Sequence, residues 1–215
     1  MKTSRKSDEK QRNRSGTAVR AKGQQRLRDI LDAARAILVE DGYSQFSLRN
    51  IAQRAGIHLS NLQYYFPGKD ELIHALMEKV AADYKACYEE IFSALPDDPA
   101  LRFDAAIDYH LADIRSADTR RFFIQLWALL EASDVHTGIL LDRLYAYHID
   151  ELSIMIRRLN GDLSEGRIRQ NAALIAAMLE GMMLMIRDAD TALGLGEASI
   201  EDIIKKQILR IATNQ

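Results

Sequence analysis

The residues best suited to chemistry in this sequence are two side-chain amides and two phenols in one short segment. Asn61 and Gln63 can each make paired hydrogen bonds to the N6 and N7 edge of an adenine base. Tyr64 and Tyr65 follow directly, and their hydroxyl groups can donate to phosphate oxygens. Neighbouring residues on a helix point about 100° apart, so Tyr64, Tyr65 and Phe66 cannot all be buried together. The segment therefore favours contact with a nucleic acid, and simple solvation of the amides is the alternative.

Two short helices joined by a tight turn are predicted to position these side chains. Ser47 is a good N-cap for a helix through the residues LRNIAQRA, which Gly56 ends with a positive-φ turn position. A second helix is expected over about residues 59–65, because Pro67 and Gly68 follow it. This succession of short helix, turn and short helix predicts a helix-turn-helix motif.

A helix-turn-helix motif over about residues 47–66 would place its second helix in the DNA major groove. Leu62 and Phe66 are expected to face inward as apolar anchors, so the other positions of that helix must face outward. Arg49, on the exposed side of the first helix, can reach a guanine or a phosphate. A helical hairpin without DNA binding is the alternative. The candidate DNA contacts from this geometry are Arg49, Leu59, Ser60, Asn61, Gln63, Tyr64, Tyr65 and Lys69.

The rest of the chain also has the periodicity of helices. An apolar stripe runs through about residues 27–38, and a long helix is expected to begin near Lys69 and to end before the proline-rich segment 94–100. Neither strand-like alternation nor an internal repeat is found in the sequence. The sequence therefore predicts an all-α fold of about nine helices. The remaining helices are expected at about 101–116, 119–133, 137–160, 165–189 and 199–213.

The charge of the chain is unevenly distributed. The whole chain has a formal net charge of −2, yet residues 1–28 contain ten Lys and Arg against only Asp8 and Glu9. A basic front followed by an acidic remainder suggests a polyanion as partner, and a solvated tail is the alternative. Residues 1–23 lack apolar periodicity and are predicted to form a basic flexible tail.

Other classes of function are disfavoured by what the sequence lacks. No nucleophile–base arrangement, phosphate loop or paired carboxylate motif is present, so we do not expect an enzyme. His110 and Asp113 have a metal-ligand spacing, but no third ligand is apparent, so neither a metal nor another cofactor is predicted. The lone Cys87 fits a reducing compartment. The most apolar stretch, Ala172–Ile186, is too short for a membrane span and contains Glu180, and no signal peptide is seen, so a cytoplasmic location is expected.

Three motifs lie close together in the segment Ile30–Leu76: EDGY from Glu40, SLRxIAxxAGI from Ser47 and LxYYFPxKxxL from Leu62. In this spacing they resemble the N-terminal domain of the tetracycline-repressor-like (TetR) family of transcriptional regulators. The resemblance implies an N-terminal three-helix DNA-binding domain. The DNA-contacting positions that it implies are Ser47, Arg49, Ser60, Asn61, Gln63, Tyr64, Tyr65 and Lys69, a set that includes Ser47 and leaves out Leu59.

Two positions depart from the pattern of that family. Gln63 stands where the family usually has a tyrosine, so an amide would have to replace a phenol in a phosphate contact or read a base. His58 stands where a Ser or Thr usually caps the recognition helix, and it could touch a phosphate instead.

The resemblance further implies that the C-terminal half dimerises and binds an effector. Aromatic and methionine residues there suit a largely apolar or aromatic ligand, although plain helical core is the alternative. The candidates for this pocket are Tyr109, His110, Phe123, Trp127, Tyr145, His148, Met178 and Met182. Members of the family usually dimerise through their last two long helices, and packing within one subunit is the alternative. The candidates for that interface are Ile175, Leu179, Met182, Ile186, Ile204, Ile208 and Ile211.

The sequence thus predicts a tail over residues 1–23, a DNA-binding domain over 24–84 and an effector-binding and dimerisation domain over 85–215. The predicted function is a ligand-responsive transcriptional regulator, most simply a repressor, that binds a palindromic operator in double-stranded DNA as a homodimer. It would be cytoplasmic and associated with the nucleoid at its operator. The alternative is a cytosolic helical small-molecule-binding or scaffold protein without specific DNA binding.

Overall fold

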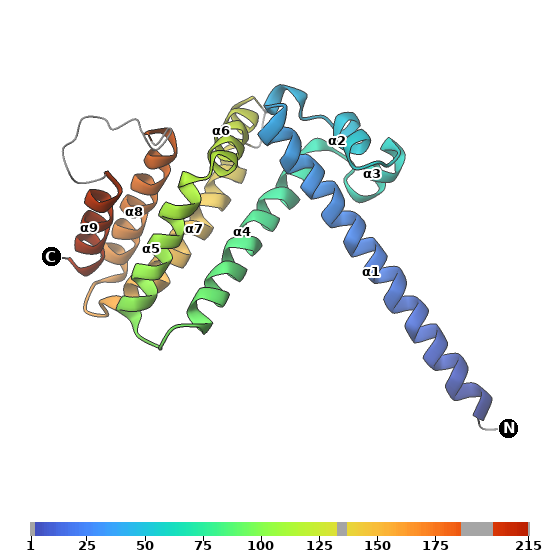
Figure 1. The fold of residues 1–215 in the computed structure, drawn as a ribbon, viewed down its shortest axis with the longest axis horizontal. Helices are drawn as coiled ribbons and strands as arrows, with labels where there is room; N and C mark the ends of the chain where they lie inside the picture. Colours follow the sequence, from blue (N-terminus) through green and yellow to red (C-terminus); the bar gives the residue numbers. More distant parts are fainter. Residues whose placement is uncertain (1–2, 133–136, 186–199, 215) are drawn as a thin grey trace. The chain divides into compact units, whose positions relative to one another are not determined.

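The described part of the chain consists of helices joined by short connections. The computed structural model describes residues 3–132, 137–185 and 200–214, with side chains described from residue 21 and, after the gap at 133–136, from residue 145. These residues include no strand, which confirms the predicted all-α fold with nine α-helices (Figure 1). The elements are α1 (Thr3–Glu40), the 3₁₀ helix η1 (Tyr43–Gln45), α2 (Leu48–Arg54), α3 (Leu59–Tyr65), α4 (Lys69–Ser93), α5 (Pro99–Arg115), α6 (Ala117–Glu131), α7 (Thr137–Leu159), α8 (Glu165–Met185) and α9 (Ile200–Thr213).

The chain divides into two compact units, Met1–Leu76 and Met77–Gln215, and the boundary falls within α4. It lies before residue 84, where the sequence analysis ends the DNA-binding domain. In addition, α1 begins at Thr3 and so contains most of the segment predicted as a flexible tail. Its many Lys, Arg and Gln residues have good helix propensity even without an apolar stripe. The limits of the functional domains stay predictions.

The first unit packs the C-terminal part of α1 against α2, and α2 against α3 (Figure 1). The connection out of α1 is made by Gly42, whose φ of 84° suits glycine and whose N–H donates to the Ile37 carbonyl (2.9 Å). The apolar stripe predicted on α1 is buried in this core. The core side chains, each at most 5% exposed, are Ile30, Leu31, Ala34, Ile37, Leu38, Phe46, Ile51, Ala52, Leu62, Phe66, Leu72, Ile73 and Leu76.

The turn between α2 and α3 has the conformation that the sequence predicts. Gly56 has a φ of 65°, in the left-handed region that favours glycine. The next amide, that of Ile57, donates to the Ala52 carbonyl (3.0 Å) and closes the turn. Ala52 is 2% exposed, and its small side chain permits close approach of the two helices. These short helices therefore form the predicted helix-turn-helix.

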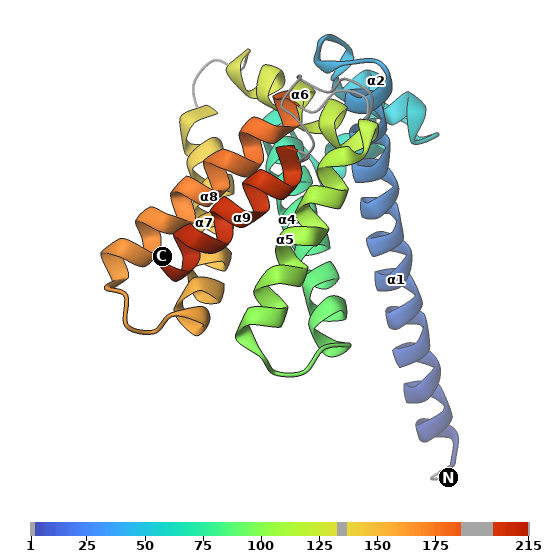
Figure 2. The same ribbon diagram turned by 60° about the vertical axis from the view of Figure 1, so that its left-hand side comes forward.

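The second unit is a bundle in which α7 and α8 pack side by side and α5 contacts α6, α7, α8 and α9 (Figure 2). The ends of its helices are capped as their sequences suggest. Asp98 Oδ1 accepts the Ala100 amide (2.8 Å) at the start of α5, and Ser116 Oγ accepts the Thr119 amide (3.3 Å) at the start of α6. The fully buried side chains of this unit include Phe103, Ile107, Phe122, Leu129, Leu152, Ile156, Ala172, Ile175 and Ile208.

Candidate nucleic-acid interface and ligand cavity

The helix α3 exposes its polar residues and buries its two apolar anchors. Leu62 is fully buried and Phe66 is 5% exposed, so the inward positions predicted for both are confirmed. Tyr64, by contrast, is 84% exposed. The exposed side chains of α3 are Ser60, Asn61, Gln63 and Tyr64. This face thus offers two amides, a hydroxyl and a phenol to an external partner.

The helix α2 is fixed at both ends by side-chain hydrogen bonds. Ser47 Oγ accepts the Asn50 amide (3.2 Å), which confirms Ser47 as the N-cap. At the other end, Arg54 donates to Asp41 Oδ2 (3.0 Å) and pairs with Glu40. These bonds tie α2 to the end of α1. A DNA contact by Ser47 would have to share its capping hydroxyl.

Two basic side chains are exposed on the helices that precede and follow α3 in the chain. Arg49 is exposed on α2, and Lys69 is exposed at the start of α4. The Lys69 Nζ lies 5.7 Å from the centroid of the Phe46 ring, within the range of a cation–π contact. The lysine is thus held near the end of α3 while its charge stays accessible.

The remaining candidates on α3 are less exposed or differently engaged. Tyr65 is half-buried and meets the Tyr64 ring edge-on, with centroids 5.4 Å apart. Leu59 is also half-buried. His58 occupies the N-cap position, but its side chain makes no capping hydrogen bond and is exposed. The imidazole is therefore available for another contact, as the departure from a Ser or Thr cap suggests.

In the second unit, a cavity of about 60 Å³ lies among α4, α5, α6, α7 and α8. That volume is several times what one water molecule requires. The cavity is lined on several sides by aromatic rings. These rings are Tyr84, Tyr88, Phe123, Tyr145 and Tyr147.

The two tyrosines from α4 are held by hydrogen bonds through their hydroxyl groups. Tyr84 donates to Asp113 Oδ2 (2.5 Å), and Thr119 Oγ1 donates to the other oxygen of the same carboxylate (2.9 Å). The Tyr88 hydroxyl is hydrogen bonded to His110 Nε2. Burial raises the pKa of both tyrosines, and the Asp113 carboxylate raises the pKa of Tyr84 further. Both phenols therefore stay protonated and fixed in orientation.

Two histidines in the cavity wall are neutral. His110 and His148 meet edge to face, with ring centroids 5.1 Å apart. Burial lowers the pKa of His110 to about 3, with a contribution from His148, and burial lowers the pKa of His148 to about 4. At neutral pH these rings therefore bring no positive charge to the cavity.

A carboxyl group on α8 is the most unusual member of the wall. Glu180 lines the cavity, and its Oε2 is buried with no hydrogen-bond partner among the described residues. Burial raises the pKa of Glu180 to about 7. Burial and then the charge of Glu180 raise the pKa of Tyr145. In the sequence analysis, Glu180 served only as evidence against a membrane span. A charged residue within the most apolar stretch of the chain was nevertheless a signal of a buried functional group.

The structure brings together half of the residues predicted for an effector pocket. Tyr109 and Trp127 do not line the cavity, but their rings lie next to rings that do. The Tyr109 and Tyr84 centroids are 6.0 Å apart, and the Trp127 and Phe123 centroids are 6.5 Å apart. Met178 is half-buried and Met182 is buried, and neither lines the cavity. The candidates that do line it are His110, Phe123, Tyr145 and His148, and the wall residues that the sequence analysis missed include Tyr84, Tyr88, Tyr147, Glu151 and Glu180.

Four of the seven residues predicted for a dimer interface are buried inside the subunit, and the interface itself stays a prediction. These four, Ile175, Leu179, Met182 and Ile208, are at most 2% exposed because they pack into the core of their own bundle. Ile204 and Ile211 are half-buried, and Ile186 lies outside the described residues. The burial of the first four residues favours the alternative, packing within one subunit.

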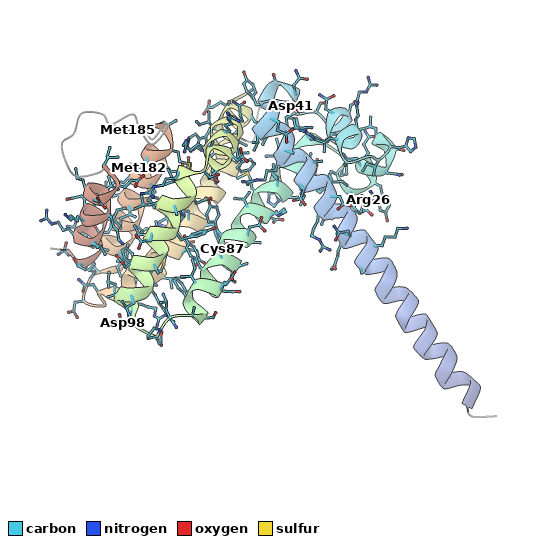
Figure 3. All side chains as sticks on the ribbon, viewed as in Figure 1. Arg26, Asp41, Cys87, Asp98, Met182 and Met185 are labelled. Atoms are coloured by element: carbon cyan, nitrogen blue, oxygen red, sulfur yellow. The ribbon has the colours of Figure 1, made fainter. Side chains whose placement is uncertain are left out.

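A different set of apolar side chains faces outward from the last two helices. On α8, Leu174, Leu184 and Met185 are 51%, 59% and 54% exposed, and on α9 Ile203 is 46% exposed. Figure 3 labels Met185 near the end of α8, three residues beyond the buried Met182. Exposed apolar side chains at this spacing suit a contact with another protein surface.

Within the described ranges, the fold offers neither a membrane span nor a metal centre. No described helix combines the length and the apolar character needed to cross a bilayer. Nor do His, Cys, Asp and Glu side chains gather anywhere in that part of the chain in a group of three or more that could hold a metal ion.

Comparisons with known proteins match this arrangement. The model of the family described as bacterial regulatory proteins, tetR family, matches residues 30–76. The HTH-type transcriptional regulator BetI of Burkholderia thailandensis is 28% identical over 167 residues, which cover 74% of this chain and 80% of that protein. A TetR transcriptional regulator from Legionella pneumophila has the same fold, with a TM-score of 0.64 and 20% identity over 85% of this chain and 94% of its own. So does the multidrug binding protein EbrR complexed with imidazole, with a TM-score of 0.62 and 17% identity over 86% and 94%.

Proposed function

Because the chain belongs to the tetR family of bacterial regulatory proteins, we propose that it is a ligand-responsive repressor that binds its operator as a homodimer. Its family consists of DNA-binding transcription regulators rather than enzymes. Beyond the family, we propose that this chain binds a specific operator, forms a dimer and has an effector site. The protein would then be located at its operators on the chromosome.

The observation that carries the proposal is the division of α3 into a buried and an exposed side. Leu62 and Phe66 hold the helix, while Asn61 and Gln63 face solvent with amides suited to adenine. Tyr64 stands at the end of the helix, where a phenol can reach the phosphate backbone. The exposed cations of Arg49 and Lys69 would add phosphate contacts. The proposed interface therefore reads bases with the first part of α3 and holds the backbone around it.

The outward apolar residues of α8 and α9 support a two-fold dimer. Leu174 and Leu184 lie on the same side of α8, with the exposed Ala177 and the half-buried Gly181 between them. A Cβ added at Gly181 would meet no atom within 4 Å, so this position is open to a partner surface. Two such dimer-related subunits would present their recognition helices to half-sites roughly 34–36 Å apart on a pseudo-palindrome.

This dimer can be tested by charge substitution on the outer face. Leu174→Glu with Leu184→Glu should convert the protein to a monomer in light scattering, because a charge is disfavoured in an apolar interface. Leu101→Glu on α5 is the matched control, since Leu101 is 49% exposed and lies on another helix. A double variant that stays dimeric would remove this face from the proposal.

The cavity of the second unit is the proposed effector site. Its volume of about 60 Å³ is smaller than that of most ligand sites, but it shares their largely aromatic lining with a few polar groups. The fold similarity to a multidrug binding protein complexed with imidazole supports a small molecule as the ligand of this chain. An effector bound there would change operator affinity only by its differential affinity for the DNA-binding and non-binding states.

Selection of genomic DNA fragments by the purified protein, followed by gel shift, tests the function as a whole. We expect enrichment of a short two-fold-related sequence, and loss of binding to it when Asn61 and Gln63 are both replaced by alanine. Mutation of Gln53, exposed on α2, gives a control on a neighbouring surface. Enrichment of no specific sequence would favour the alternative, a helical small-molecule-binding or scaffold protein.

A further inference from the structure

The charged groups that face the cavity are all of one sign among the described residues. Glu151 from α7 and Glu180 from α8 line it, whereas no lysine or arginine does. The two histidines of the wall are neutral, as their lowered pKa values show. A negatively charged ligand would therefore meet repulsion there and find no positive partner.

The aromatic rings of the cavity wall also favour a positively charged ligand. Because the hydroxyl groups of Tyr84 and Tyr88 are committed to Asp113 and His110, these phenols line the cavity in fixed positions. The face of an aromatic ring carries negative partial charge and attracts cations. Tyr145, Tyr147 and Phe123 line the same space from α7 and α6. Several rings around one small volume resemble the cages that bind quaternary ammonium groups.

Glu180 supplies the observation that points to a ligand. A buried oxygen atom without a hydrogen-bond donor is costly in a folded protein. In the described structure the cavity beside it holds no side chain that could compensate a carboxylate charge. A positively charged ligand would remove this cost by pairing with the carboxylate, and a neutral apolar ligand would increase it by excluding water.

We propose that the cavity binds a small organic cation, an amine or quaternary ammonium ion, with Glu180 as its counter-ion and the surrounding rings as its aromatic cage. The inference rests on the proposed function only in taking the cavity as the effector site. The cation would lie against the rings of Tyr84 and Tyr145, with Glu151 as a second source of negative charge in the wall. Hydrogen-bonding cations and fully alkylated cations share this chemistry, and both belong to the proposed class.

Paired probes of equal shape test this inference on the wild-type protein. Phenyltrimethylammonium and tert-butylbenzene differ in a charged nitrogen against a neutral carbon, and benzoate adds an anion of similar size. We expect the cation to bind at least roughly tenfold more tightly than the neutral probe in calorimetry, and benzoate not to bind. Equal or tighter binding of tert-butylbenzene would overturn the inference without any mutation.

Glu180→Gln then identifies the counter-ion. The variant keeps the shape of the side chain, and we expect it to weaken phenyltrimethylammonium binding by roughly tenfold or more while sparing tert-butylbenzene. Glu90→Gln, on the exposed side of α4, is the matched control and should bind as wild type does. Unchanged affinity for the cation in Glu180→Gln would contradict the role of Glu180.

Gel shift on the selected operator separates this inference from the proposed function. If the protein binds a specific operator but discriminates none of the probes by charge, the proposed cation site is wrong and the proposed regulator function is supported. If it binds the cation as expected but selects no DNA sequence, the proposed cation site is supported and the proposed regulator function is wrong.

Discussion

The exposed face of α3 and the cavity of the second unit use polar side chains in opposite ways. On α3, Asn61 and Gln63 are exposed and can hydrogen bond to water, so they do not lower the stability of the unbound protein. In the cavity, the Glu180 carboxyl is buried without a hydrogen bond to Oε2 from the described residues, so it lowers stability until a partner arrives. As proposed, α3 would gain specificity from the polar side chains that it exposes, and the cavity from a buried carboxyl oxygen that lacks a hydrogen bond among the described residues. Substitutions in the two regions should therefore change different quantities.

The largest effect is expected at the anchor beneath the recognition face. Leu62→Ala should lower the free energy of unfolding by about 2–5 kcal/mol, because the side chain is fully buried and its removal leaves a cavity. Tyr64→Ala, two residues further along, removes an 84% exposed ring and should change stability by no more than about 0.5 kcal/mol. Denaturant unfolding measures both. Similar losses of stability in the two variants would mean that α3 is not divided into an anchored and a displayed side.

Glu180→Gln should have the next largest effect, and its sign depends on pH. The folded protein raises the pKa of Glu180 from 4.5 to about 7. Between these values the folded state keeps a proton that the unfolded state has released, so stability falls as pH rises through this range. The variant does not titrate there and keeps its stability. It should therefore gain on the wild type by on the order of 2 kcal/mol between about pH 5 and pH 8 in denaturant unfolding.

The neighbouring titrating groups do not disturb this comparison. His110 and His148 have lowered pKa values, so they reduce stability as pH falls below their ordinary 6.5, but they do so in both proteins. The tyrosines of the wall have raised pKa values and stay protonated throughout. A constant difference between Glu180→Gln and wild type across this range would show that the carboxyl is not desolvated in solution.

On the displayed side, Asn61→Ala should act on specificity rather than stability. Removal of a paired hydrogen bond to a base should reduce discrimination at one operator position by about 1–3 kcal/mol, measured by competition with single-base operator variants. Arg49→Ala is a useful partner variant, since a phosphate contact by Arg49 would weaken all sequences equally. A uniform weakening in Asn61→Ala would instead make the amide a backbone contact.

The sequence predicts the first unit well because its signals are local. Ser47 caps α2, Gly56 makes the turn, and Pro67 follows the end of α3. The residues that determine where each helix begins or ends therefore lie within a few positions of that helix in the sequence. The inward positions of Leu62 and Phe66 follow from helical periodicity alone. This is why the helix-turn-helix and its exposed residues could be predicted together.

The cavity could be predicted only in part because five helices contribute to it. Tyr84 and Tyr88 have the spacing of ordinary core residues on α4, and nothing near them in sequence identifies Asp113 or His110 as their partners. The state of Glu180 likewise depends on burial by other helices. The burial of four predicted interface residues within their own subunit could not be predicted for the same reason, since periodicity detects an apolar face but not the surface that covers it.

The smallest change in sequence preference is expected from the basic segment at the N-terminus. Residues 1–22 carry eight Lys and Arg against two acidic residues, a composition that suits binding to phosphate or the minor groove. Their deletion should flatten the plot of log K against log salt by about 0.9 for each phosphate that the segment neutralises, while the ranking of operator variants stays as it was. A full-length variant with these basic residues replaced by glutamine should behave like the deletion, because charge rather than chain length produces the effect. An unchanged slope would show that the segment neutralises no phosphates, and an altered ranking would show that it reads sequence together with α3.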